Sequence, residues 1–149
     1  MSLRVLSLLA VLACVACGSD SPVPAPSATV ATPPAAAGPP KPLEGASITI
    51  TSAGFTLDRT SAAAFSIKDL HVYQGARLTF LNSDLVSHDV LSDPLHIHTD
   101  CPEINAAGYL VPGQSRATDP LNRLRTCGFH DHTSEGNDAF SGSVTIESR

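Results

Sequence analysis

Short stretches in which apolar and polar residues alternate fill most of the chain after residue 46. Successive side chains of a strand point to opposite faces of a sheet, so this period of two predicts strands. The stretches that read as strands are 48–51, 55–57, 66–73, 77–81, 88–91, 108–111, 123–127 and 143–146. We expect Gln74–Gly75 and Pro112–Gly113 to form turns between them. No convincing helical repeat is present, and about seven or eight short strands predict an all-β, antiparallel Greek-key sandwich or barrel.

The N-terminus differs from this pattern. Arg4 is followed by the apolar run Val5–Ala13, which is typical of a signal peptide and too short to remain as a membrane-spanning helix. Small residues precede Cys17, and the segment resembles a bacterial lipoprotein signal in which Cys17, or alternatively Cys14, receives the lipid. An ordinary secretory signal is the other interpretation. Both predict export to the periplasm or cell surface, with residues 1–17 as the signal peptide.

Residues 18–45 form a second region of distinct composition. Eight of the 12 prolines lie here among Ala, Ser and Thr. Such a segment buries too little apolar surface to offset its ordering entropy, and proline favours extended geometry. We therefore expect a disordered linker at 18–45 and one folded domain at 46–149.

Charge and motifs narrow the function. The net charge is −5 and no run of Lys or Arg stands out, which argues against nucleic acid as the main partner because phosphate binding needs clustered cations. The sequence shows no serine-histidine-aspartate triad pattern, phosphate loop or paired-carboxylate site. We expect a protein that is not an enzyme and that acts as a monomer.

Histidine and cysteine gather in the C-terminal part of the chain, which suggests a copper or zinc site. The residues are His88, His96, His98, Cys101, Cys127, His130 and His132. Cys127 and His130 flank Gly128–Phe129, so we expect both to reach one ion from a single loop. With His88 they give the trigonal set of two imidazoles and one thiolate that is typical of type 1 copper.

Several stretches resemble the cupredoxins, in the same order along the chain. The resemblance covers roughly residues 46–148 and rests on Gly75–Asp84, Ser87–Val90, Leu110–Ser115, Cys127–His130 and Gly142–Ile146. It implies a copper-binding β-sandwich able to transfer electrons, with His88, Cys127 and His130 at the ligand positions. It also implies redox or copper-handling proteins as partners, and a hydrophobic docking patch for which Leu121 and Phe129 are candidates.

The chain departs from that family at the axial position, because Met1 is its only methionine. Counting forward from His130 reaches Glu135, whereas counting back from Gly142 reaches Phe140, and His132 is a third candidate. A carboxylate favours Cu(II), whereas an apolar neighbour raises the reduction potential. The sequence leaves these alternatives open.

The insert 93–103 adds a second question. His96 and His98 lie on one side if this segment is extended, and a secondary metal site there is an alternative to a polar surface loop. Cys101 is able to pair with Cys127 in an oxidising compartment, which would remove the thiolate. The sequence therefore leaves two functions open: a one-electron carrier, or a copper or zinc chaperone or storage protein that uses the histidine-rich loops.

Overall fold

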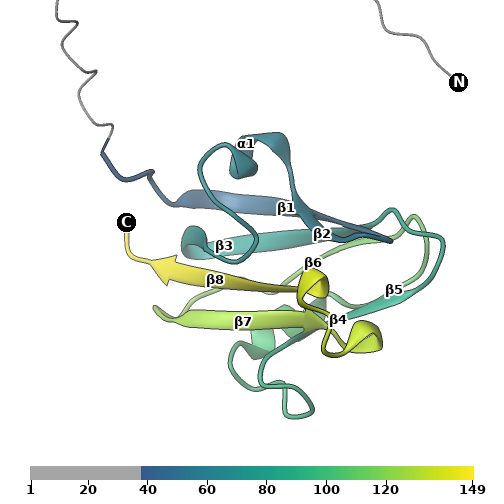
Figure 1. The fold of residues 1–149 in the computed structure, drawn as a ribbon. Coiled ribbons are helices and arrows are strands. Elements are labelled where there is room, and N and C mark those ends of the chain that lie inside the picture. Colours follow the sequence, from purple (N-terminus) through teal and green to yellow (C-terminus); the bar gives the residue numbers. More distant parts are fainter. Residues whose placement is uncertain (1–37) are drawn as a thin grey trace, which may run out of the picture. The chain divides into compact units, whose positions relative to one another are not determined.

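The computed structural model describes residues 38–149, and the predicted signal peptide and most of the predicted linker lie outside them. Within these residues, eight strands make up nearly all of the regular structure (Figure 1). They are β1 (Leu43–Thr51), β2 (Gly54–Leu57), β3 (Leu70–Asn82), β4 (His88–Ser92), β5 (Gly108–Leu110), β6 (Ser115–Ala117), β7 (Thr126–Asp131) and β8 (Ser141–Glu147). The helices are short: α1 (Arg59–Ala62) and the 3₁₀ turns η1 (Pro102–Ala106), η2 (His132–Ser134) and η3 (Asp138–Phe140). Within residues 38–149, no helix is long and apolar enough to cross a bilayer.

The strands follow the order β2-β1-β3-β8-β7-β4-β5, and β6 pairs with β3 beside this path. The predicted all-β fold is confirmed, but the pairing is mixed, since β3 runs parallel to both β1 and β8. The other strand pairs are antiparallel. The first half of β3 pairs with β8 and its second half with β1 and β6, so this long strand connects the two parts of the fold.

The turn predicted at Gln74–Gly75 is wrong, because β3 continues through it. The register between β1 and β3 shifts between Leu43 and Gly45, opposite this part of β3. Gly75 takes a positive φ of 88° there, a conformation that suits glycine because it has no Cβ. A bulge in one strand therefore replaces the predicted turn between two.

The core is built from the alternate residues that the sequence pattern identified. Ile48 and Ile50 of β1 and Leu78 and Phe80 of β3 are completely buried. Phe129 of β7 packs against Phe55 and Phe80, with ring centroids 5.8 and 5.6 Å apart. Leu121 and Phe129 are both fully buried, so neither offers the docking surface that the family resemblance implied.

The position of β7 matters most for the site. The pattern predicted a strand at 123–127 that ends at Cys127, whereas β7 starts at Thr126 and ends at Asp131. Cys127–His130 therefore lies inside a strand rather than in a loop. Phe129 anchors this register, because its ring is in the core while its strand neighbours face the other way.

Replacing Phe129 by Ala should lower the free energy of unfolding by about 3–5 kcal/mol, because it leaves a cavity beside two other aromatic rings. Chemical denaturation followed by circular dichroism measures this loss. Leu124→Ala is the control: Leu124 is 57% exposed, and we expect a change within about 0.5 kcal/mol. Equal losses in the two variants would contradict the burial of Phe129 and the register of β7.

Candidate metal centre

Cys127 and His130 lie on opposite faces of β7. They are three positions apart in a strand, and side chains separated by an odd number of positions point to opposite sides. Cys127 points into the core, where its sulfur forms a disulfide with Cys101, and the two Cα atoms are 5.8 Å apart. Cys127 therefore offers no thiolate in this structure, and the predicted pairing of Cys127 with His130 on one ion is wrong.

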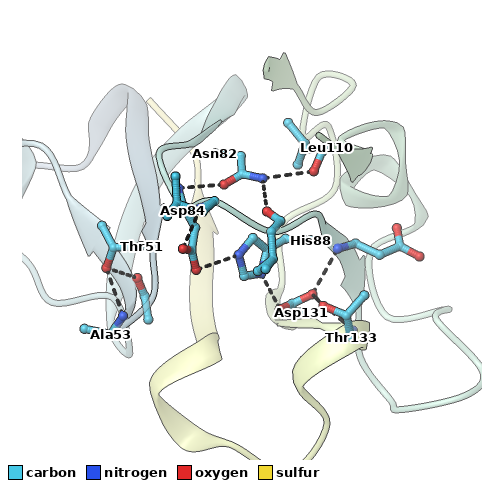
Figure 2. A network of polar contacts seen from close by, with 12 residues as sticks. Thr51, Ala53, Asn82, Asp84, His88, Leu110, Asp131 and Thr133 are labelled. Atoms are coloured by element: carbon cyan, nitrogen blue, oxygen red, sulfur yellow. Dashed lines mark hydrogen bonds and ion pairs between the residues drawn. The ribbon is translucent and has the colours of Figure 1, made fainter. Parts of the chain in front are cut away.

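His88 lies on the inner side of the fold, at the start of β4, and is only 2% exposed. Its Nδ1 is 2.7 Å from Oδ2 of Asp131, and its Nε2 is 3.3 Å from Oδ2 of Asp84 (Figure 2). Its ring also stacks on Phe140, with centroids 5.5 Å apart. Both ring nitrogens face carboxylate oxygens, so neither nitrogen points to an open ligand position.

Asp131 is the centre of this buried network. Its carboxylate also accepts hydrogen bonds from the backbone N–H of Asp89, at 2.9 Å, and from the hydroxyl of Thr133, at 2.8 Å (Figure 2). Burial raises the pKa of Asp131, but the hydrogen bonds from His88 and Asp89 outweigh it, so the pKa lies below its usual value of 3.8. The network ties β4 to the end of β7.

The predicted ligand set of His88, Cys127 and His130 is therefore not assembled. His88 is held by two carboxylates, Cys127 is in a disulfide, and His130 faces the other side of β7. The residues of this structure do not fit a type 1 copper ion, because no thiolate is available to such a set.

Four histidines come together on the outer side of β7. His98, His130 and His132 each offer a ring nitrogen, and these ligand atoms lie within 4.8 Å of one another. The ring centroid of His98 is 5.3 Å from that of His130 and 5.0 Å from that of His132. His96, His132 and Glu135 form a second such group, also within 4.8 Å. We call these the inner trio (His98, His130, His132) and the outer trio (His96, His132, Glu135).

The hydrogen bonds of His130 and His98 leave one nitrogen of each ring for a metal ion. Nδ1 of His130 donates to Oδ1 of Asp93 at 2.6 Å, and Nδ1 of His98 donates to the carbonyl of Ser92 at 3.0 Å. This fixes the Nε2 lone pair as the free acceptor in both rings. Among the described residues, Nε2 of His130 is buried and has no hydrogen-bond partner. A carboxylate or carbonyl behind a histidine is the usual support of a metal ligand.

The loop that carries His98 is fastened to β7 at two places. Asp93 donates its backbone N–H to the carbonyl of Gly128 at 3.0 Å. A Cβ on Gly128 would lie 1.9 Å from the Asp93 carboxylate, so glycine is needed for Asp93 to reach His130. The Cys101–Cys127 disulfide holds the far end of the loop. The disulfide thus positions His98 instead of supplying a ligand.

His96 and His98 both adopt left-handed backbone conformations, with φ of 70° and 57°. This region costs a residue other than glycine about 1–2 kcal/mol. Such strain persists where the surroundings hold it in place, and here Asn105 Nδ2 donates to the carbonyl of His98 at 3.0 Å. The extended segment predicted for His96 and His98 is therefore wrong, but both histidines do reach the metal-ligand clusters.

The three axial candidates are found in different places. Glu135 and His132 belong to the outer trio, and Oε1 of Glu135 is 3.2 Å from Nδ1 of His132. Phe140 stacks on His88. Asp93 and Asp131 were not identified from the sequence. A strand in which Phe129 faces the core is the signal that could have found Asp131, because alternation then puts Asp131 on the core side and His130 on the outer side.

No family model and no curated protein matches the sequence. Solved structures of similar fold include a purple cupredoxin from Nitrosopumilus maritimus, at 18% identity and a TM-score of 0.44, covering 68% of this chain and 99% of that one. A reduced auracyanin from Roseiflexus castenholzii has 18% identity and a TM-score of 0.47, covering 72% and 99%. A mutant fern plastocyanin has 16% identity and a TM-score of 0.46, covering 68% and 99%.

Replacing Asp131 by Ala should destabilise the fold by about 2–4 kcal/mol at pH 7, because it leaves buried donors of His88 and Asp89 without an acceptor. Denaturation curves measure this loss. The folded-state pKa of Asp131 is depressed, so its contribution is present above the unfolded pKa and is lost as the pH falls through the folded one. The difference in free energy of unfolding between Asp131→Ala and the parent should therefore become smaller below about pH 4. A difference that widens in acid would contradict an ionised Asp131.

The disulfide predicts a cross-linked peptide that contains Cys101 and Cys127 in a non-reducing digest, and that separates after reduction. Mass spectrometry detects it without interference from Cys14 and Cys17. The double variant Cys101→Ser, Cys127→Ser should lose about 3 kcal/mol of stability, because the unfolded chain gains the freedom that the cross-link removes. Two alkylated cysteines at these positions in the unreduced protein would contradict the bond.

Proposed function

We propose that this protein is an exported copper-binding protein that holds the ion on the imidazoles of His98, His130 and His132. Two observations carry the proposal: Nε2 of His130 is buried and lacks a hydrogen-bond partner among the described residues, and His98, His130 and His132 each offer a ring nitrogen within 4.8 Å of the other two. Three neutral imidazoles suit Cu(II) and Zn(II), and Cu(II) binds such a set more tightly.

The proposed role is copper handling: sequestering the ion or passing it to other copper-handling proteins. The sequence pattern favoured a one-electron carrier in which a thiolate binds copper, and that carrier needs the Cys127 sulfur that the structure places in a disulfide. The imidazole cluster instead supports the chaperone or storage function that the sequence left as the alternative.

Export is part of the proposal. The signal-like N-terminus suggests it, and disulfides persist in oxidising compartments such as the periplasm. We propose that the chain is attached by a lipid on Cys17 or Cys14 and that the residues before β1, which begins at Leu43 rather than at the predicted boundary of 46, separate the domain from the membrane.

A Cu(II) titration with absorption and electron paramagnetic resonance tests the proposal. We expect one tightly bound ion with nitrogen couplings and weak d–d absorption, because Cys101 and Cys127 are joined in a disulfide and give no thiolate for an intense charge-transfer band. His130→Gln and His98→Asn should each weaken Cu(II) binding by about 100-fold or more. Asn is chosen at His98 because it tolerates the left-handed backbone.

His71→Ala is the matched control. His71 is paired with Glu147 and Asp69, away from either trio, and we expect unchanged Cu(II) affinity. Gly128→Ala tests the support of His130, because it displaces Asp93 and should weaken binding by about 10-fold. An intense visible band that disappears in Cys127→Ser would overturn the proposal, and so would parental affinity in His130→Gln.

A further inference from the structure

The outer trio is more exposed to solvent than the inner trio. Its members His96, Glu135 and His132 are 67%, 37% and 35% exposed at their side chains, whereas the side chain of His130 is 9% exposed. Oε1 of Glu135 is 3.6 Å from Nδ1 of His96 and 3.2 Å from Nδ1 of His132. One carboxylate and two imidazoles therefore converge at the surface beside the buried ligand of the inner trio.

His132 belongs to both trios. Its Nδ1 is buried and, among the described residues, makes no hydrogen bond, since its approach to Glu135 does not have hydrogen-bond geometry. The ring centroids of His96 and His98 are 6.0 and 5.0 Å from that of His132, so the shared imidazole lies between the two groups. The left-handed backbone of His96 is a second sign that this surface position is held in place.

We propose that the outer trio is the entry position for the metal ion, which then moves to the inner trio with His132 as the common ligand. This inference rests on the proposed function. The move exchanges Glu135 oxygen and His96 nitrogen for the nitrogens of His98 and His130, and His132, which offers a ring nitrogen to both groups, is the ligand that they share. The oxidation state of the ion does not change.

Sharing His132 limits the two trios to one ion at a time. A neutral imidazole has one lone pair, because its other nitrogen carries the proton. His132 therefore binds in the outer or in the inner trio at any moment. The negative charge of Glu135 attracts a hydrated cation. The inner trio contains no carboxylate and lacks this attraction.

The test is stopped-flow mixing of the protein with Cu(II), together with equilibrium titration. His96→Asn and Glu135→Gln should each slow Cu(II) association by about 10-fold, because the capture ligands are lost. Dissociation should slow equally, since the ion leaves by the path it enters, and the equilibrium affinity should stay within about 3-fold of the parent. His98→Asn should weaken the affinity instead.

Glu44→Gln is the control for charge. It also removes one carboxylate, but Glu44 lies on β1, where it pairs with Arg149 and belongs to neither trio, so the association rate should stay that of the parent. His71→Ala is the control for loss of a surface imidazole.

Three results would overturn the entry position while leaving copper binding intact. Unchanged association rates in both outer variants would mean that the ion arrives elsewhere, for example through the cavity of about 240 Å³ lined in part by Asp93, Leu95 and His130. If His96→Asn lost as much Cu(II) affinity as His98→Asn, the two trios would be a single binding site and not an entry position and a final one. Two Cu(II) ions bound per chain would contradict the proposal that His132 serves both trios. Parental affinity in His130→Gln would instead overturn the proposed function itself.

Discussion

The arrangement of the candidate site depends on the two-residue period of β7. Phe129 packs among the core aromatic rings, and this places Cys127 and Asp131 on the inner side of the strand and His130 on the outer side. A shift of one residue would exchange every one of these side chains between the faces. The core packing of a single phenylalanine therefore decides which histidine is free to bind metal.

The two sides of β7 give their histidines different roles. On the inner side, His88 is held between Asp84 and Asp131, so its nitrogens serve the connection of β4 to β7. On the outer side, the hydrogen bonds that hold His98 and His130 engage Nδ1 and leave Nε2 as the free acceptor of each ring. The same residue type is thus a structural group on one face and a candidate ligand on the other.

The loop between β4 and η1 shows how a fold can position candidate metal ligands that lie outside any helix or strand. His96 and His98 sit in left-handed conformations, which cost energy that the loop's own contacts must offset. The disulfide at one end and the approach of Asp93 to Gly128 at the other hold the loop against β7. The cysteine that the sequence pattern offered as a ligand contributes through geometry, by keeping His98 beside His130.

The sequence by itself determined the all-β class, most strands and the gathering of histidines near the C-terminus, because these follow from local alternation and composition. It also named every residue of both trios and raised the Cys101–Cys127 pairing as one of two alternatives. The tertiary structure decided the register of β7, which starts three residues later than the pattern indicated. That register depends on packing against β8 and on the rings of Phe55 and Phe80, which are distant in sequence. Only these long-range contacts could show that Cys127-Gly-Phe-His130 is a strand whose ends face opposite ways.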